Sequence, residues 1–278
     1  MVMGPLQKKL FRVLFQQWGQ SLAIIAVVAC GVAAYICLYS CYLNLKLTRD
    51  TYYFQERYAH FEIMVDRAPD TAVFRVEQMP GVRRAQGRIV QDVTVDIEGI
   101  NEPRTGRIIS MPVPHHDVLN DIVLDQGNYF APGAQDEVIV SDRFAKANNL
   151  ELGDRIDVNI ESKQYNLRVI GLAMSPEFVY MIRNIQELIP APERFGVLWV
   201  PRDFAETALN MEAASNSIVG FADDPDHLEP LFDQIDEELE AYGVFAKLDR
   251  DNMISNRFIS DEIYSLGITA QVTPAIFL

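Results

Sequence analysis

A long uncharged stretch near the N-terminus constrains this chain more than any other feature. No Asp, Glu, Lys or Arg occurs between Val13 and Leu45. An α-helix rises about 1.5 Å per residue, so roughly 20 apolar residues cross the ~30 Å hydrocarbon layer of a bilayer. Residues 20–43 are therefore predicted to form one transmembrane helix, which makes the lipid bilayer the first expected partner.

The same apolar stretch could also be a cleavable signal peptide or a lipoprotein signal. A cleavable signal peptide has an apolar core of about 7–15 residues, whereas here the apolar run continues past Val32 and Ile36. Residues 27–31, Val-Val-Ala-Cys-Gly, look like a lipobox that would make Cys30 a lipidated residue. More than ten uncharged residues follow Cys30, where a lipoprotein would begin a polar tether. We expect the retained helix and keep the lipoprotein as an alternative.

The basic residues beside the span predict its orientation. Lys8, Lys9 and Arg12 precede it, and Lys46 and Arg49 follow it. Basic residues in short flanks remain preferentially on the cytoplasmic side. The N-terminus is therefore expected in the cytoplasm of a cell with the helix in its cytoplasmic (inner) membrane, and the main domain is expected to be periplasmic or extracellular.

Residues 1–19 form an expected amphipathic segment on the cytoplasmic side. One face is apolar and the opposite face is basic or polar, as in a helix lying at the membrane interface. The apolar positions are Leu6, Leu10, Leu14 and Trp18. An ordinary basic flank of a membrane anchor would have the same composition.

A stripe of small residues follows one side of the predicted span. Small side chains at three- and four-residue spacing let helices approach closely in lipid. The stripe is predicted to be a transmembrane packing face, and its members are Ala23, Ala26, Cys30, Ala33, Ala34, Cys37 and Cys41.

Charge separates the first 49 residues from the remainder. The chain has a formal net charge of −15, and five basic residues but no acidic residue precede Asp50, which leaves −20 on residues 50–278. An acidic domain argues against nucleic acid as a partner. No cysteine follows Cys41, so the domain must be stable without a disulfide.

The fold class expected for residues 44–266 is α+β. Residues 61–65 are predicted as a strand, 70–78 as a helix that Pro80-Gly81 ends, and 82–98 as a half-buried strand with alternating apolar residues. A similar unit is predicted near the end, with strands at 217–221 and 244–248 and a helix at 226–242. We expect a split β-α-β, ferredoxin-like part from about 59–100 and 215–260.

The intervening residues, about 101–214, are predicted to be a β-rich insertion. Glycines and prolines separate short apolar segments. The expected strands are 107–111, 137–140, 155–160, 165–172 and 196–200, with a short helix at 142–149 and a long loop at 175–195.

The sequence lacks several common motifs of catalytic, nucleotide-binding and zinc-binding sites. No phosphate-binding loop, dinucleotide fingerprint, serine elbow or HExxH zinc motif occurs. The His115-His116-Asp117 cluster is expected to be a solvated loop, and Ser175-Pro176-Glu177 lacks a nearby histidine to activate the serine. We predict no enzyme activity, no catalytic residues, no metal and no cofactor.

The order of these features resembles the FtsX-like or MacB-type permease subunits of ABC transporters. The matching motifs are residues 18–25 (WGQSLAII), Pro80-Gly81-Val82, 136–141 (DEVIVS), 152–154 (LGD), 169–171 (VIG) and 194–199 (RFGVLW). The resemblance implies a first transmembrane helix, an extracytoplasmic core domain and three further helices. Residues 267–278 would approach the second helix, so the chain is expected to be the N-terminal portion of a longer permease.

The resemblance also implies partners. These are an ABC ATPase subunit, bound through a cytoplasmic loop beyond this sequence, a second permease copy or paralogue, and a periplasmic adaptor protein. The domain would couple ATP-driven motion to export or to the handling of an envelope substrate. The alternative is a complete single-pass, membrane-anchored binding or sensor domain.

Overall fold

The computed structural model describes Lys9, Arg12 and residues 16–100, 102–184, 186 and 189–275. The chain divides into two compact units, one formed by Met1–Thr51 with Ile259–Leu278 and the other by Tyr52–Phe258. Most of the predicted amphipathic segment, including Leu6, Leu10 and Leu14, lies outside the described residues, as do residues 276–278.

The first unit is built from two helices, α2 (Trp18–Gln55) and α7 (Ile254–Ala275). Over its 38 residues α2 is about 57 Å long at 1.5 Å per residue. Within the described residues, it is the one helix long and apolar enough to cross a membrane. The helix extends beyond the predicted span because no Pro or Gly interrupts residues 32–55.

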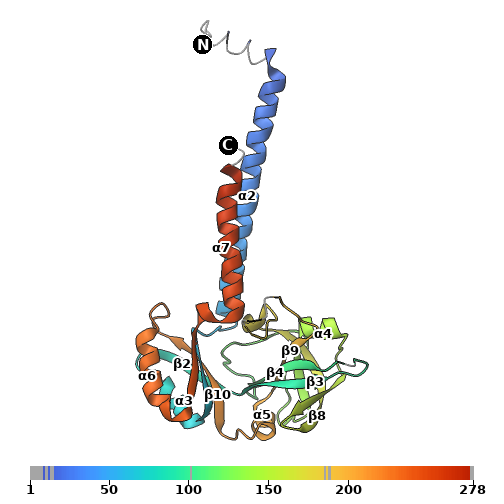
Figure 1. Cartoon of the computed structure of the whole chain (residues 1–278), viewed down its shortest axis with the longest axis vertical. Helices are drawn as coiled ribbons and strands as arrows, with labels where there is room; N and C mark the ends of the chain where they lie inside the picture. Colours follow the sequence, from blue (N-terminus) through green and yellow to red (C-terminus); the bar gives the residue numbers. More distant parts are fainter. Residues whose placement is uncertain are drawn as a thin grey trace. The chain divides into compact units, whose positions relative to one another are not determined.

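Helices α2 and α7 lie side by side and antiparallel within this unit (Figure 1). A Cβ atom on Gly267 would come 3.0 Å from the Tyr42 ring, so glycine permits close approach there. Arg49 Nη1 donates a hydrogen bond to Ser260 Oγ at 3.2 Å. The residues of α7 buried along this side include Ile263 and Ala270, at the spacing of one helix face.

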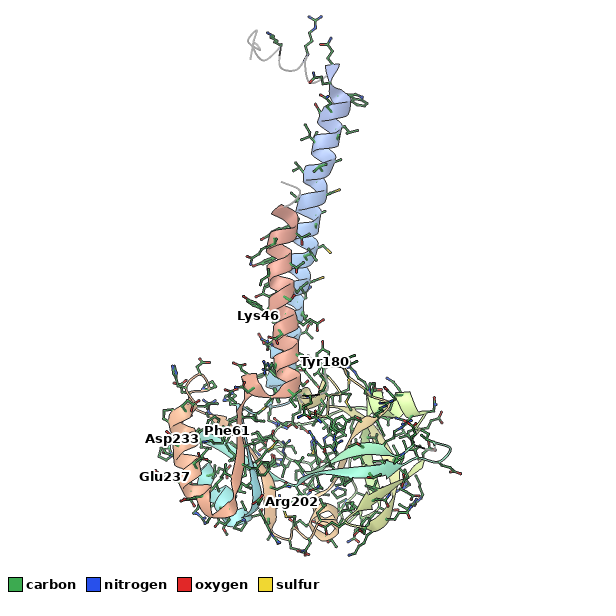
Figure 2. All side chains as sticks on the ribbon, in the orientation of Figure 1. Lys46, Phe61, Tyr180, Arg202, Asp233 and Glu237 are labelled. Atoms are coloured by element: carbon green, nitrogen blue, oxygen red, sulfur yellow. The ribbon has the colours of Figure 1, made fainter. Side chains whose placement is uncertain are left out.

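The second unit contains a four-stranded antiparallel sheet in the order β11-β1-β10-β2. Its strands are β1 (Phe61–Pro69), β2 (Val82–Arg88), β10 (Ala214–Ala222) and β11 (Val244–Asp249). Helices α3 (Asp70–Glu77) and α6 (Glu229–Leu239) pack on one face, where Phe61 and Ile235 are fully buried. Asp233 and Glu237 lie on the solvent side of α6 (Figure 2).

A seven-stranded mixed sheet forms the remainder of this unit, in the order β5-β8-β6-β9-β4-β3-β7. Because β7 also pairs with β8, the pairing closes six of these strands into a barrel and leaves β5 beside β8. The elements are β3 (Val90–Asp96), β4 (Arg104–Met111), β5 (Val123–Gly127), β6 (Glu137–Ser141), β7 (Arg155–Ile160), β8 (Lys163–Met174), β9 (Phe195–Pro201), α4 (Asp142–Asn148) and α5 (Arg202–Ala208). Short 3₁₀ turns are η1 (Pro176–Phe178), η2 (Glu240–Tyr242) and η3 (Arg250–Asn252).

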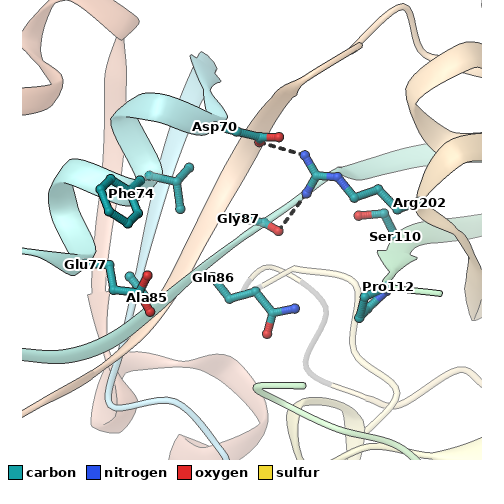
Figure 3. A pocket seen from close by; sticks show the side chains of 10 residues that line it. Asp70, Phe74, Glu77, Ala85, Gln86, Gly87, Ser110, Pro112 and Arg202 are labelled. Carbon is teal, nitrogen blue, oxygen red and sulfur yellow. Dashed lines mark hydrogen bonds and ion pairs between the residues drawn. The ribbon is translucent and has the colours of Figure 1, made fainter. Parts of the chain in front are cut away.

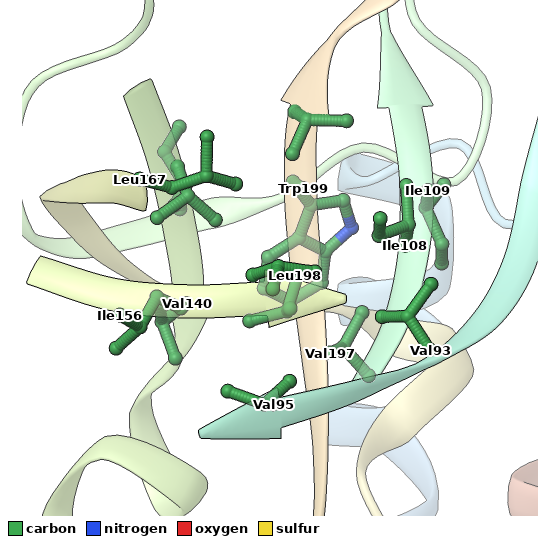
Figure 4. Close-up of a cluster of buried hydrophobic side chains, with 14 of the residues drawn as sticks. Val93, Val95, Ile108, Ile109, Val140, Ile156, Leu167, Val197, Leu198 and Trp199 are labelled. Carbon is green, nitrogen blue, oxygen red and sulfur yellow. The ribbon is translucent and has the colours of Figure 1, made fainter. Parts of the chain in front are cut away.

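The barrel core surrounds Trp199, whose side chain is 1% exposed (Figure 4). Branched side chains from β3, β4, β6, β7, β8 and β9 contact one another there. Gly196 on β9 faces the ring of Phe144 from α4, and a Cβ atom would meet that ring at 2.5 Å. The described residues after α2 thus form a mixed α/β domain with two sheets, in agreement with the predicted class.

One predicted strand differs from the structure. Residues 82–98 do not form a single strand, because they divide into β2 of the four-stranded sheet and β3 of the barrel. Arg88 and Ile89 are consecutive and both buried, so the side-chain alternation slips by one residue between them. The backbone N–H of Ile89 donates to Ser110 Oγ at 2.8 Å and not to a strand partner.

The predicted helix 226–242 also needs adjustment. It begins at Glu229, next to Pro230, because proline is well tolerated in the first helical turn. It tightens into the η2 turn and ends at Gly243, whose φ of +71° favours glycine.

Candidate functional site

The predicted packing face of α2 is mostly exposed in the single chain. Ala34 is half-buried, and the other members are exposed: Ala23, Ala26, Cys30, Ala33, Cys37 and Cys41. Their role in packing against another helix stays a prediction.

The side of α2 that packs toward α7 is a different one. Gly31 is buried, and Leu38 and Tyr42 are half-buried. Each of these residues follows a stripe cysteine by one position, which is about 100° around an α-helix. Helix α7 therefore leaves the cysteine side of α2 open.

In the second unit, a buried cluster around Arg88 connects the four-stranded sheet to a loop. We call such an arginine-centred connection between separate segments a joint. Arg88 is 3% exposed, and its guanidinium donates to Glu177 at 2.7 and 3.0 Å and to Glu62 at 3.0 Å. Ser217 Oγ donates to the same Glu62 carboxylate at 2.6 Å. Burial alone lowers the pKa of Arg88, but Glu177 and Glu62 reverse this effect and hold it above its ordinary value.

The cluster ties together segments that are far apart in sequence. Glu62, Arg88 and Ser217 belong to β1, β2 and β10, whereas Glu177 lies in η1 at the start of the long loop. Ser175 Oγ accepts the backbone N–H of Glu177 at 3.3 Å. The Ser-Pro-Glu motif therefore caps the η1 turn and places a carboxylate on Arg88.

The same loop also contacts the first turns of α7 that belong to this unit. The backbone N–H of Tyr180 donates to Ser255 Oγ at 3.1 Å. The rings of Tyr180 and Phe258 lie 5.9 Å apart. The loop thus bridges the barrel, the four-stranded sheet and residues 254–258.

A second arginine joint lies between α5 and the four-stranded sheet (Figure 3). Arg202 donates to Asp70 Oδ1 at 2.7 Å, to the Gly87 carbonyl oxygen at 3.0 Å and to Glu206 Oε1 at 2.7 Å. A cavity of about 270 Å³ lies beside this joint, with Phe74 and Pro112 on opposite walls.

The histidine cluster belongs to a third joint. Arg57 donates to the Val118 carbonyl oxygen and to Asp121 Oδ2, both at 2.8 Å, and His115 Nε2 lies 2.8 Å from Asp121 Oδ1. His116 is exposed, and its Nε2 lies 3.4 Å from Oδ2 of the adjacent Asp117. In the described part of the chain, no group of three or more His, Cys, Asp or Glu side chains could hold a metal ion.

A larger cavity, about 460 Å³, lies beside His60 and is lined by Asp226, Phe232 and Asp249 among others. Burial, with the charge of Arg250, lowers the pKa of His60 to about 4. His60 is therefore neutral near pH 7. Its Nδ1 lies 3.2 Å from the Ala222 carbonyl oxygen, so one ring nitrogen is occupied by backbone.

The adjacent acids Asp136 and Glu137, which could have served acid–base chemistry, form ion pairs instead. Asp136 pairs with Arg155 at 3.2 Å, and Glu137 pairs with Arg168 at 2.9 Å. These ion pairs connect β6 and the residue before it to β7 and β8.

No protein-family model and no curated protein matches this chain. Several solved domains are similar to it, among them the following three. The extracellular domain of the ABC-type transporter YknZ from Gram-positive bacteria is 15% identical, over 67% of this chain and 99% of that domain, with a TM-score of 0.43. The periplasmic region of MacB from Actinobacillus actinomycetemcomitans is 11% identical, over 73% and 92%, with a TM-score of 0.42. A domain of a protein described as a permease, from Porphyromonas gingivalis, is 13% identical over 72% and 96%, with a TM-score of 0.39. At these identities the similarity is one of fold.

The residues of the three joints were not predicted from the sequence. Arg88, Glu177 and Arg202 are separated from their partners by long stretches of chain. A sequence signal existed only for Glu62, an acid on the second face of a strand whose first face is apolar. Charged residues on such faces are ordinarily solvated, so the pattern alone does not reveal a buried ion pair.

Proposed function

We propose that this chain is the N-terminal part of an ABC transporter permease of the FtsX-like or MacB type. Helix α2 crosses the cytoplasmic membrane, and residues 52–258 lie outside the cytoplasm. The domain follows ATP-driven movement of the membrane helices and acts on an envelope substrate or partner. An ABC ATPase subunit, a second permease copy or paralogue and a periplasmic adaptor are the proposed partners.

The pairing of α7 with α2 carries this proposal. A single-pass anchor needs no second helix along its first one. Here the chain returns to α2, and Gly267 and Ser260 of α7 contact Tyr42 and Arg49 of α2. A returning helix is expected of a permease with several spans, whereas the single-pass binding or sensor domain gives no reason for it.

We also propose that the four-stranded sheet is a ferredoxin-like layer split by the β-rich part. Its strand order, β11-β1-β10-β2, supports this because each β-α-β connection skips one strand. Helix α3 connects β1 to β2, and α6 connects β10 to β11. Such a layer would keep both ends of the domain in one rigid sheet.

Cross-linking in membranes tests the helix pair. In a cysteine-free background, Tyr42→Cys with Gly267→Cys is expected to react with a short bismaleimide and link α2 to α7. A protease site is inserted at the exposed turn around Gly99 so that the link can be seen on a denaturing gel. After cleavage, a cross-linked chain runs as one band, whereas an unlinked chain separates into two fragments. Ser40→Cys with Gly267→Cys is the matched control, since Ser40 lies about 200° from Tyr42 around the helix.

A link at Tyr42 but not at Ser40 supports the permease. Equal linking at both positions, or none at either, contradicts the packed pair and favours the single-pass domain. The orientation is tested separately by a reporter that is active only outside the cytoplasm, inserted at the same turn. Activity is expected there because Lys8, Lys9 and Arg12 favour a cytoplasmic N-terminus.

A further inference from the structure

One edge of β2 is free of strand partners. Within the described residues, β2 pairs with β10 alone and ends the four-stranded sheet. The Gly87 carbonyl oxygen accepts Arg202 Nη1, so it points away from β10. In an antiparallel pair both backbone groups of a residue face the same way, and every second residue faces the same side. The N–H and C=O of Ala85 therefore also point away from β10.

In the described part of the chain, this free edge faces a cavity and no further strand covers it. The cavity of about 270 Å³ is lined by Ala85, Gln86 and Gly87 along the strand (Figure 3). Ser110 and Pro112 of the β4 end form the opposite wall, and Arg202 closes one end. Natural proteins normally cover or block a strand edge, because its unpaired N–H and C=O groups attract another strand.

The walls of the cavity are chemically asymmetric. Helix α3 contributes the Phe74 ring, which is 60% exposed, and the Glu77 carboxylate one helical turn later. The positive charge of Arg202 is already compensated by Asp70 and Glu206. The slot therefore offers an apolar surface followed by a negative charge, which suits the aliphatic stem and charged head of a Lys or Arg side chain.

We infer that the β2 edge is a docking slot for an extended, basic peptide segment of a partner protein. The segment pairs with the outward N–H and C=O of Ala85 as an added strand, a common mode of peptide recognition. A basic side chain on the helix side lies over Phe74 and reaches Glu77. This site is independent of the proposed transport activity, since peptide binding is measured without ATPase or substrate.

Fluorescence anisotropy with the full-length chain in detergent tests the slot. The probe is a fluorescein-labelled hexapeptide of alternating Val and Lys. A peptide of the same sequence with N-methyl groups on every backbone nitrogen has the same charge but cannot pair as a strand. Saturable binding is expected for the first peptide, and at least about tenfold weaker binding for the second, because two backbone hydrogen bonds are lost.

Protein variants separate strand pairing from general attraction to an acidic surface. Ala85→Pro removes an outward N–H without removing a bond to β10, which edge strands tolerate, and it should weaken binding about tenfold. Phe74→Ala and Glu77→Gln should each weaken it several-fold, and Phe245→Ala, exposed on β11, should not. If Ala85→Pro does not fold, Phe74→Ala and the methylated peptide decide the result. Equal binding of both peptides, or no saturable binding, overturns the inference.

Discussion

Replacing Arg88 by Met should strongly destabilise the second unit. Arg88 is the cation between two carboxylates whose side chains are 10% exposed in Glu62 and 9% exposed in Glu177. Its removal leaves two uncompensated acids in a nearly dry site. Breaking a buried ion pair from one side costs about 3–5 kcal/mol. For a unit of this size that corresponds to a fall in Tm of about 6–20 °C.

Thermal unfolding followed by Trp199 fluorescence measures the effect. The sequence contains two tryptophans, so a Trp18→Phe background leaves the buried Trp199 as the reporter. Arg155→Met is the matched control, because Arg155 and its partner Asp136 have side chains 49% and 56% exposed and such surface pairs contribute about 0–1 kcal/mol. Combining Arg88→Met with Gln at both carboxylates should restore most of the stability. If Arg88→Met costs no more than Arg155→Met, the cluster does not hold the unit together.

Three further predictions concern other parts of the chain. The pKa of His60 is lowered to about 4, below the ~6.5 of an unfolded histidine, so stability should be lost as the pH falls from about 6.5 toward 4. His60→Asn should flatten that part of the pH–Tm curve. An unchanged curve would show that His60 does not cause the loss of stability. Cys30→Ser should keep its membrane attachment and differ in mass only by the substitution, whereas loss of a diacylglycerol-sized mass would favour the lipoprotein. In a complete transporter, Ala26→Leu or Ala33→Leu should reduce assembly while Ile24→Leu should not, because a larger side chain on a close-packed face separates helices in lipid. Co-purification of the subunits measures assembly, and equal behaviour of all three variants would contradict the packing face.

The elements that sequence patterns predicted are those with strong local signals. Residues 61–65 and 217–221 are short, mainly apolar segments, and they appear within β1 and β10. Two residues separate Pro80-Gly81 from the end of α3, and Gly243 directly follows η2, in agreement with their preference for helix ends. In these places the local chain and the tertiary contacts favour the same conformation.

The break between β2 and β3 had no local signal. A pattern argument assigns Arg88 to solvent, which keeps the alternation of residues 82–98 intact. The structure buries Arg88 because Glu62 and Glu177 neutralise it from 26 and 89 residues away in sequence. Helix α5 was not predicted either, and its Arg202 pairs with Asp70 at a separation of 132 residues. Long-range ion pairs of this kind cannot be derived from composition or periodicity.

Neighbouring residues of α2 lie on two different sides of the helix, one toward α7 and one carrying the cysteines. The residues buried or half-buried on the side of α7 include Gly31, Leu38 and Tyr42, whereas Cys30 and Cys37 are exposed one position earlier. About 100° of helix surface separates these sides, so α7 can occupy one of them without covering the other. A larger side chain at Gly267 would separate α2 from α7 inside one chain, because its Cβ already reaches the Tyr42 ring. A larger side chain on the cysteine side would leave that pair intact and act only on a helix that comes from elsewhere, which makes contacts within the chain distinguishable from contacts with a partner.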